Sequence, residues 1–492
     1  MTVETLDRPA SSALLAQPGV GHFIDGREET DGDGFPVLNP ATGEEIARCA
    51  AGSAETVDRV VASARTAFDD GRWRLLPAKE KEARLRAYAR LVEQHAEDFV
   101  HLDVVDGGLL AGYSRFVVQF SIDMINYYAG WPTKLHGSIP SVSPDLFIRQ
   151  VREPIGVCAI ILPWNGPSFT AGFVTAALAC GNSVVLKPAE QTPLSAILAA
   201  RLALEAGIPA GVFNVVQGLG AVAGDALVRH RDIGTISFTG SSATGRRIQA
   251  AAAEHLTPVT MELGGKSPHI VFADADIEAA AQTVAAAVWG HCGQVCTAGT
   301  RVLVERSIHD RFAERVVELS RGLKVGPGDD PASQIGPLIS QAQFDRVTSY
   351  MQLGRQEGAS LLLGGNRVGD RGYFVEPTIF GNVTNDMRIA REEIFGPVMS
   401  LLVFDSDEQA LAIANDSAFG LAAGIWTRDL DRANRFSDRL RAGTVWINSY
   451  QLVDPAVSYG GHKGSGFGRN LGEESLDHYL QTKSVWIRTP AQ

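Results

Sequence analysis

The sequence predicts an α/β protein built from two doubly wound parallel sheets. Short apolar runs alternate with helical runs from residue 155 onward, and a second alternation of the same kind begins after residue 262. The short runs are apolar at nearly every position, as expected for parallel strands that helices cover on both faces. Apolar residues make up 45% of the 492 residues and charged residues 20%, so the chain can bury large cores. We therefore expect two α/β domains that join near residue 262.

The expected elements follow in chain order. The first 20 residues resemble a flexible tail, Ser53 is a suitable N-cap for a helix, and residues 79–105 have the pattern of a charge-rich helix. In the first alternation, each expected strand is followed by a helix. The strand–helix pairs are 157–162 with 169–179, 183–187 with 193–206, 212–216 with 221–229, and 235–238 with 243–254, and a last strand follows at 258–262. The second places strands at 269–272, 301–304, 399–404, 422–426 and 444–448, and helices after Asp274 or Asp276 and at 308–319, 407–415 and 430–440.

Composition and charge exclude several classes of protein. The chain carries 44 Lys and Arg against 56 Asp and Glu, a net charge of −12, whereas nucleic-acid-binding proteins usually have a basic surplus. Five cysteines, an odd number, do not form a disulfide scaffold and suit a reducing compartment. The N-terminus lacks the pattern of a targeting signal, and no apolar stretch reaches the roughly 18 residues that a membrane span needs. We expect a cytoplasmic protein that binds neither nucleic acid nor membrane.

Two glycine-rich loops are candidate phosphate-binding sites. Residues 218–224 and 240–245 each follow an expected strand and open an expected helix, which places backbone N–H groups where a pyrophosphate can bind. Neither loop has the G-x-G-x-x-G spacing, and Arg246-Arg247 stand where a P-loop has Lys-Ser/Thr. A P-loop is therefore excluded, and each loop taken alone is equally well explained as a tight turn without a ligand.

Cys292 and Cys296 lie in a glycine-framed segment that allows three interpretations. With His291 they make a weak metal-binding pattern, since no second Cys/His pair follows. A disulfide is disfavoured in a reducing compartment. The third interpretation is a nucleophilic thiol next to a helix start, whose positive end lowers the pKa of the thiol.

Two polar residues follow apolar strands and can serve catalysis. Glu262 ends a strand just before two glycines, where partial burial raises the pKa of a carboxyl toward that of a general base, although a salt bridge to Lys266 explains it equally well. Asn165 stands between two prolines at the end of the first strand of the sheet. Its amide can donate to a developing oxyanion, or the residue is simply part of a turn.

Six motifs in this order resemble the aldehyde dehydrogenase superfamily, and the resemblance runs from about residue 20 to the C-terminus. The motifs are Pro163-Trp164-Asn165, Lys187-Pro-Ala-Glu190, Phe238-Thr-Gly-Ser241, Glu262-Leu-Gly-Gly-Lys-Ser267, Gly293-Gln-Val-Cys296 and Glu393-Ile-Phe-Gly-Pro397. The resemblance implies two Rossmann-like domains and a small β arm for oligomerisation into a homodimer or homotetramer. It divides the chain into a tail (1–20), a cofactor-binding domain (21–130 and 155–261), a catalytic domain (262–465) and an arm (131–154 and 466–492).

The resemblance also implies a mechanism. Cys296 would attack an aldehyde to form a thiohemiacetal, and Asn165 and the Cys296 backbone N–H would bind the oxyanion. Hydride transfer to a nicotinamide would leave a thioester, which Glu262 would hydrolyse by activating water. No metal takes part in this scheme. A coenzyme A-acylating enzyme is an alternative, against which Glu262 argues, and a catalytically silent binding or structural relative is another.

The cofactor implied is NAD. Lys187 and Glu190 resemble the pair that holds the adenine ribose, and a carboxylate there disfavours the 2′-phosphate of NADP. The other residues that the resemblance assigns to cofactor binding are Trp164, Gly220, Gly224, Ser241, Leu263, Glu393 and Phe395.

The sequence departs from the family pattern at two kinds of position. Phe173 or a neighbour replaces a frequent lysine and Asn470 a common glutamate, so two groups thought to carry protons to the general base are missing, and deacylation is expected to be slow or differently routed. Glycines stand where many relatives have larger side chains around the substrate tunnel. Together with uncharged neighbours they predict a wide, uncharged tunnel for bulky aromatic or long-chain aldehydes; these residues are Gly166, Gly172, Gly290, Val295, Thr297, Gln451 and Val453.

Overall fold

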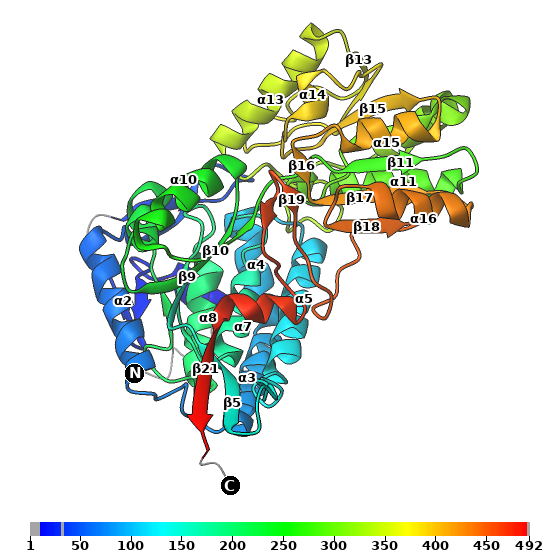
Figure 1. The fold of residues 1–492 in the computed structure, drawn as a ribbon. Coiled ribbons are helices and arrows are strands. Elements are labelled where there is room, and N and C mark those ends of the chain that lie inside the picture. The colour runs from blue at the N-terminus through cyan, green and yellow to red at the C-terminus, as the bar shows by residue number, and fades with distance from the viewer. Residues whose placement is uncertain (1–9, 31–33, 490–492) are drawn as a thin grey trace.

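The structure is a computed structural model that describes residues 10–30 and 34–489. It contains two large sheets in separate parts of the molecule, with helices on both faces of each (Figure 1). The predicted class, α/β with two doubly wound parallel sheets, is confirmed.

The first sheet has eight strands in the order β2-β1-β8-β7-β6-β9-β10-β20. The five strands from β8 to β10 are parallel, and the order along the chain reverses at β6, which lies between β7 and β9. Ligands of open α/β sheets bind at such a switch point, beyond the carboxyl ends of the strands. The strands are β1 (His22–Ile24), β2 (Arg27–Glu29), β6 (Val157–Ile161), β7 (Ser183–Lys187), β8 (Phe213–Val215), β9 (Ile233–Thr239), β10 (Val259–Glu262) and β20 (Gly466–Phe467).

Alternate side chains of the central strands fill two different cores. In β6, Cys158 and Ile160 belong to the core beneath one helical layer, and Val157, Ala159 and Ile161 to the core on the other face. This explains why the strands are apolar at every position. One face is covered by α3 (Ala78–Gln94), α4 (Ala96–Gly107), α5 (Ala111–Ala129), α6 (Phe169–Phe173), α7 (Thr175–Ala179) and α8 (Leu194–Glu205), and the other by α2 (Ala54–Asp69), α9 (Asp225–Val228) and α10 (Ser242–Ala252).

The second sheet has seven strands in the order β13-β14-β15-β12-β11-β17-β18, all parallel except the edge strand β13. Its strands are β11 (Pro268–Val271), β12 (Arg301–Glu305), β13 (Ser360–Leu363), β14 (Thr378–Gly381), β15 (Val398–Phe404), β17 (Ala422–Trp426) and β18 (Thr444–Ile447). Its helices are α11 (Ile277–Trp289), α12 (His309–Arg321), α13 (Gln341–Gln356), α14 (Arg388–Arg391), α15 (Asp407–Asn415) and α16 (Leu430–Arg439).

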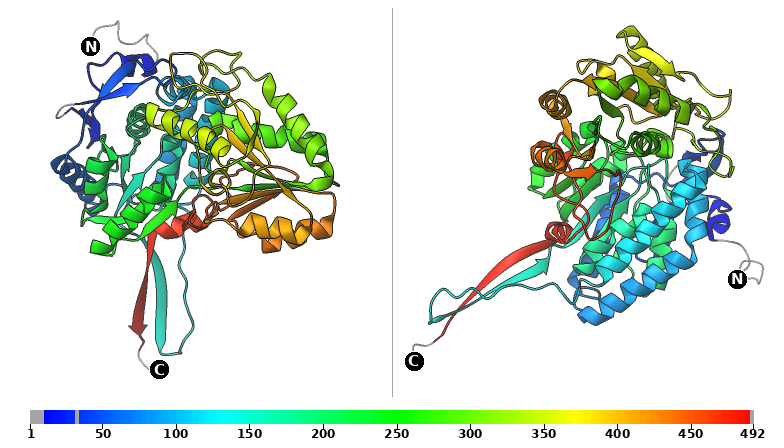
Figure 2. Two further views of the ribbon diagram at one scale, coloured as in Figure 1. Left: turned by 90° about the horizontal axis from the view of Figure 1, so that it is seen from above. Right: turned by 90° about the vertical axis from the view of Figure 1, so that its right-hand side faces the viewer.

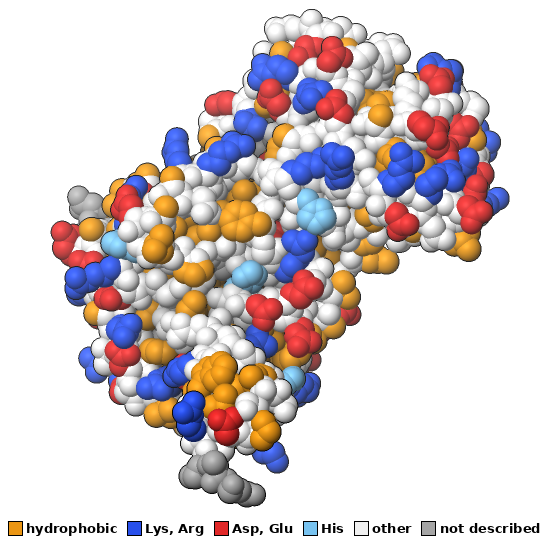
Figure 3. All heavy atoms as spheres, viewed as in Figure 1, with side chains coloured by type: hydrophobic (Ala, Val, Ile, Leu, Met, Phe, Trp, Pro, Cys, Tyr) orange, Lys and Arg blue, Asp and Glu red, His pale blue; other side chains and the backbone are white. Residues whose placement is uncertain are grey.

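A two-stranded antiparallel ribbon leaves the body of the protein. It pairs β5 (Leu146–Pro154) with β21 (Leu480–Arg488) along their whole length, and Figure 2 shows it projecting away from both sheets. Three large apolar side chains on it are exposed: Phe147, Trp486 and Ile487. Elsewhere on the face shown in Figure 3, acidic and basic side chains are interspersed. Short pairs complete the fold: β3 (Phe35–Leu38) with β4 (Glu45–Cys49), and β16 (Phe419–Gly420) with β19 (His462–Lys463).

Several expectations about individual segments were wrong. Of the expected tail, residues 1–9 lie outside the described residues, but α1 (Ala10–Leu15) is part of the fold, because Leu14 is buried and Ser11 donates through its backbone N–H and its hydroxyl to Asp98. The helix expected over 79–105 is divided at His95, whose ring bonds Asp98 in the first turn of α4.

Two further segments also differ from the expectation. The helix expected over 169–179 is broken at Val174 into α6 and α7. The arm expected from 466 onward begins only at β21, because β20 pairs with β10 at the edge of the first sheet, with Met261 opposite Phe467.

Candidate active site

The candidate site lies where loops at the carboxyl ends of β6, β9 and β10 meet loops of the second sheet. Two cavities join there, an apolar cavity of about 360 Å³ and a larger cavity of about 690 Å³. Six residues line both cavities: Pro163, Asn165, Thr239, Glu262, Leu263 and Cys296. The structure thus brings together the three residues predicted for catalysis, at the junction of two spaces.

Cys296 occupies a loop that follows α11, not the start of a helix as expected. The chain leaves α11 through a tight turn at Gly290–Gly293, in which His291 and Cys292 have positive φ angles of 46° and 54°. Such backbone is strained for residues other than glycine and is held here by its surroundings. The side chain of Gln294 anchors the loop, since its amide oxygen accepts from Ile339 N at 2.9 Å. Among the described residues, Cys296 is therefore not in the first turn of a helix.

The Cys296 thiol has an unusually high pKa in this environment. Burial raises the pKa to about 11, and the negative charges of Glu393 and Glu262 add to the effect, whereas a hydrogen bond from Tyr459 opposes it. The distance from Sγ to the Tyr459 hydroxyl oxygen is 3.3 Å. Removal of the thiol proton therefore needs a base in the same cavity.

The other interpretations of the cysteine segment find no support in the geometry. The His291 ring stacks on Tyr113 at 5.3 Å between ring centroids, and burial lowers the pKa of this histidine to about 3. All five cysteines are free thiols. Within residues 10–30 and 34–489, no three His, Cys, Asp or Glu side chains are close enough to hold a metal ion.

Glu262 ends β10 and is almost fully buried, with 4% of its surface exposed. Neither carboxyl oxygen has a hydrogen-bond partner, and burial raises the pKa well above its usual range, opposed by the positive charge of Arg469. The expected alternative, a salt bridge to Lys266, is wrong, because the Lys266 ammonium has no hydrogen-bond partner either. A buried carboxyl without partners is suited to take up a proton.

Asn165 connects the loop after β6 to the cysteine loop. Its amide nitrogen donates to the carbonyl oxygen of Gln294 at 2.9 Å. An amide has two N–H groups, so this bond fixes the plane of the side chain and leaves the second donor for a ligand. Because Asn165 lines both cavities beside Cys296, that donor is available where an oxyanion would form.

The larger cavity collects five of the nine residues predicted for cofactor binding: Trp164, Ser241, Leu263, Glu393 and Phe395. Ser241 caps α10 by accepting from Thr244 N at 3.1 Å, which places the first turn of this 11-residue helix at the cavity wall. The Trp164 and Phe395 rings meet edge to face at 5.3 Å. A helix N-terminus, aromatic surfaces and a carboxylate at a topological switch point fit a dinucleotide.

Glu393 is held rigidly at the wall of this cavity. Its carboxylate accepts from Gly265 N at 2.8 Å, and a Cβ atom at Gly264 would lie 2.2 Å from Glu393 Oε2. Gly264 is therefore required for the close approach of this carboxylate, whereas Gly265 allows the close approach of the Cys296 carbonyl oxygen, which an added Cβ would meet at 2.4 Å. Burial raises the pKa of Glu393.

The remaining four predicted residues form a separate cluster near the carboxyl end of β7. The Lys187 ammonium is buried, donates to Pro188 O at 2.9 Å and lies 3.7 Å from Glu190 Oε2. Added Cβ atoms at Gly220 and Gly224 would lie 3.9 Å from Glu190 Oε2 and 3.4 Å from Lys187 Cδ. These four residues lie together, but they do not line the larger cavity.

Aromatic side chains form most of the wall of the apolar cavity. They come from α5 and α6 and from the C-terminal region, and among the described residues Glu262 supplies the only carboxyl group of the wall, which has no Lys, Arg or His. The aromatic residues are Tyr113, Phe116, Phe120, Phe169, Phe173 and Tyr459. Tyr113, Phe116 and Phe120 were not predicted as site residues, although their spacing of three and four residues places them on one helix face.

The glycines expected to widen this space do so only in part. Gly166 lines the cavity, but the Phe169 ring fills the space beside it, since an added Cβ would lie 2.4 Å from that ring. Gly172 instead allows α6 to approach α5, with an added Cβ 3.0 Å from Met124 Sδ. Gly290 borders open space but does not line the cavity. Val295, Thr297, Gln451 and Val453 line the wall as expected.

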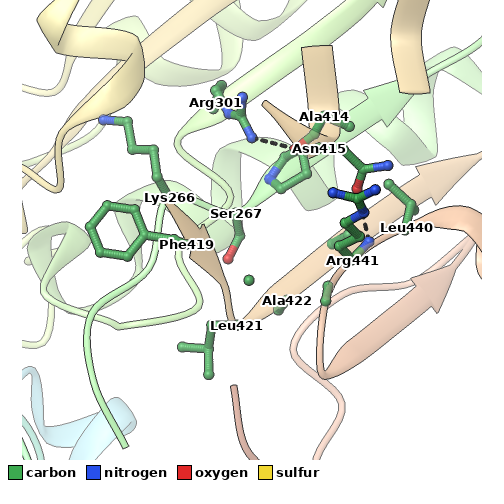
Figure 4. Close-up of a pocket in the computed structure, with 14 residues that line it drawn as sticks. Lys266, Ser267, Arg301, Ala414, Asn415, Phe419, Leu421, Ala422, Leu440 and Arg441 are labelled. Carbon is green, nitrogen blue, oxygen red and sulfur yellow. Dashed lines mark hydrogen bonds between the residues drawn. The ribbon is translucent and has the colours of Figure 1, made fainter. Parts of the chain in front are cut away.

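A third, much smaller cavity lies beside the segment that follows Glu262 (Figure 4). Lys266, Ser267 and Arg301 line it, and Arg301 donates to Ala414 O at 2.8 Å. Its volume of about 10 Å³ is at the lower limit for one water molecule, so it is no substrate site.

Comparisons with known proteins find similar chains over nearly the whole length of this one. The aldehyde dehydrogenase family model matches residues 27–485. A mitochondrial benzaldehyde dehydrogenase of Antirrhinum majus is 44% identical over 94% of this chain and 87% of its own length. The NAD+ complex of an aldehyde dehydrogenase from Bacillus cereus has a TM-score of 0.96 and 41% identity, covering 98% of this chain and 99% of that one.

A second solved structure is similar over nearly its whole length. An indole-3-acetaldehyde dehydrogenase of P. syringae, a mutant in complex with NAD+ and IAA, has a TM-score of 0.94 and 42% identity, covering 97% of this chain and 98% of that one. Separately, none of the helices in the described ranges has the length and apolar character that crossing a membrane requires.

Proposed function

Because this chain belongs to the aldehyde dehydrogenase family and oxidises an aldehyde with NAD, we propose that Cys296 is its nucleophile, Asn165 its oxyanion donor and Glu262 its general base. The observation that carries this proposal is the position of these three side chains at the junction of an apolar cavity and a cavity that fits a dinucleotide. We also assign NAD binding to the first sheet (21–130 and 155–261), and the cysteine loop to a catalytic unit over 262–465.

The first step is the formation of a bond between Cys296 Sγ and the aldehyde carbon. Glu262 takes the thiol proton, the thiolate adds to the carbonyl, and the carbonyl oxygen becomes an oxyanion. The free N–H of Asn165 and the Cys296 backbone N–H donate to this oxygen. Removing one such donor typically costs about 10²–10³ in rate.

The second step converts the thiohemiacetal to a thioester and then to the acid. NAD, when bound, supplies the hydride acceptor. Glu262 first releases the thiol proton to solvent. As a carboxylate again, it takes a proton from water as the hydroxide adds to the thioester carbonyl, and the C–S bond breaks to release the carboxylic acid and regenerate the Cys296 thiolate. The presence of Glu262 disfavours transfer to coenzyme A, and the complete set of three residues disfavours a catalytically silent protein.

We propose that the substrate is a bulky, uncharged aldehyde, aromatic or long-chain. Six aromatic rings in the cavity wall and the absence of basic side chains from its described lining support this, as do relatives named for benzaldehyde and indole-3-acetaldehyde. We expect kcat/KM for benzaldehyde and indole-3-acetaldehyde to exceed that for acetaldehyde by about 10- to 100-fold, since burial of an aromatic group contributes about 1.5–3 kcal/mol. NADH absorbance with an aldehyde panel measures this ratio. A highest kcat/KM for acetaldehyde or betaine aldehyde would contradict the assignment.

We propose that Glu190 makes the enzyme prefer NAD over NADP. Its carboxylate next to Lys187 would repel a 2′-phosphate on the adenine ribose. We expect Glu190→Gln to raise kcat/KM for NADP relative to NAD by about tenfold, equivalent to about 1.4 kcal/mol of lost repulsion. Glu205→Gln, at an exposed position of α8, is the control for net charge and should leave the ratio unchanged. Identical ratios in both variants would refute the role of Glu190.

We further propose a homodimer or homotetramer, assembled through the ribbon of β5 and β21, and a cytoplasmic location. The exposed apolar side chains Phe147, Trp486 and Ile487 support an interface on the ribbon. Five free cysteines support a reducing compartment.

A further inference from the structure

The nucleophilic sulfur has a hydrogen-bonding partner that the scheme above does not use. The Tyr459 hydroxyl lies 3.3 Å from Cys296 Sγ, and within the described ranges no other side chain hydrogen-bonds this sulfur. The two residues are 163 positions apart in the chain, so the contact depends on how the C-terminal region packs against the cysteine loop.

The Tyr459 side chain is fixed from both ends. Its backbone pairs with Asn470, each N–H donating to the carbonyl oxygen of the other residue at 2.7 Å. Its ring packs against the small core formed by Phe120, Met124 and Leu471. The hydroxyl is therefore held at the sulfur without a search through rotamers.

The direction of the hydrogen bond follows from the two pKa values. Burial raises the pKa of Tyr459 well above its usual range, so the phenol remains protonated while the thiol ionises. A thiolate can only accept, and the Tyr459 O–H therefore donates to Sγ. The same bond lowers the pKa of the Cys296 thiol, against the effect of burial.

We propose that Tyr459 is a further catalytic residue, whose hydroxyl donates a hydrogen bond to Cys296 Sγ and stabilises the thiolate. This proposal rests on the assignment of Cys296 as the nucleophile. The bond acts at the two points where sulfur carries negative charge: before it attacks the aldehyde, and when it leaves from the thioester during hydrolysis. The phenol transfers no proton in either step.

The expected size of the effect has two opposing parts. A hydrogen bond to a charged group shifts a pKa by about one unit, which changes the thiolate fraction about tenfold. A more basic thiolate is also more nucleophilic, with a Brønsted slope of about 0.4–0.5, so each remaining thiolate reacts about three times faster. Loss of the bond should therefore slow attack near neutral pH by about threefold and speed it at high pH.

The test is the pH dependence of alkylation of Cys296 by iodoacetamide in the full-length Tyr459→Phe variant, which keeps the aromatic ring. We expect the apparent pKa of the thiol to rise by about one unit, with slower alkylation near neutral pH and a faster limiting rate at high pH. Peptide mass analysis identifies the alkylated cysteine. An alkylation profile identical to that of the parent enzyme would overturn the proposal.

Tyr128→Phe is the matched control. It also removes a buried phenol, one that bonds Ser475 Oγ at 2.7 Å and Gly472 O at 3.2 Å, away from both cavities. Its alkylation profile should equal that of the parent, and a shift equal to that of Tyr459→Phe would assign the effect to lost packing and refute the proposal. If Cys296→Ala retained turnover, the assignment of the nucleophile would fail by itself, whatever the result for Tyr459→Phe.

Discussion

The Cys296→Ala variant is expected to form no measurable NADH with any aldehyde, a loss on the order of 10⁴-fold or more. Alanine removes the sulfur atom proposed to bond to the substrate carbon, and the aldehyde itself is a poor hydride donor until the sulfur has added. The variant should still bind NAD, since the larger cavity keeps its other lining groups. NADH absorbance under saturating NAD and aldehyde measures the loss.

Cys292→Ala is the control for this variant. Cys292 lies in the same loop and is fully buried, but it lines neither the apolar nor the larger cavity. We expect it to retain most of the activity. Substantial NADH formation by Cys296→Ala, or a comparable loss in Cys292→Ala, would mean that the nucleophile is another group.

The Glu262→Gln variant is expected to lose steady-state turnover by about 10²–10⁴-fold, the usual contribution of a general base. Glutamine keeps the shape of the side chain but cannot take a proton from water, so the thioester accumulates. At alkaline pH, part of the Cys296 thiol is ionised without the help of a base. When substrate is added at this pH, stopped-flow absorbance should show a burst of about one NADH per site, followed by almost no turnover. If the variant lost both the burst and the steady-state turnover, Glu262 would act only before hydride transfer, and its proposed role in hydrolysis would be wrong.

The pH dependence of turnover gives a second readout for Glu262. Burial raises its pKa, so the carboxylate that acts as base is present above this pKa and is lost as the pH falls through it. Turnover of the parent enzyme should therefore rise with pH in the range where Glu262 ionises, and the residual turnover of Glu262→Gln should lack that rise.

The missing proton-carrying groups bear on the same step. Phe173 and Asn470 both line the apolar cavity, and neither has an ionisable side chain, in keeping with the expectation that Phe173 or a neighbour replaces a frequent lysine and Asn470 a common glutamate. Deacylation is therefore expected to be the slow step in the parent enzyme as well, and Glu262→Gln acts on a step that already limits the rate.

The sequence predicted the sheets well because their signal is local. A strand such as β6 is apolar at every position, since its alternate residues enter cores on opposite faces, and this pattern needs no tertiary information. The structures of α1 and β20, which were predicted wrongly, depend on contacts with residues far away in the chain. The helix α1 is stabilised by Asp98, which is 87 residues away from Ser11, and β20 is held by its pairing with β10.

In the candidate site, too, local sequence patterns were predictable and contacts between distant segments were not. Glu262 and Asn165 were predicted from their positions after apolar strands, Cys296 from its glycine-framed segment, and the ordered motifs of the family resemblance favoured a catalytic role for all three. The surroundings of the thiol were not predictable: Cys296 lies in a loop after the end of α11 and not at a helix start, and Tyr459 comes from a distant segment of the chain. Likewise, a glycine has no side chain to show its role, and Gly172 serves helix packing and not the cavity.

In the proposed mechanism, the substrate is held as a thioester on Cys296 until Glu262 activates water. Treating Glu262→Gln with NAD and benzaldehyde at alkaline pH, quenching with acid and mapping peptides by mass spectrometry detects this intermediate. We expect a benzoyl group on the peptide that contains Cys296, at that residue and not at Cys292, in an amount equal to the NADH formed. NADH formation without an acylated Cys296 would contradict this mechanism.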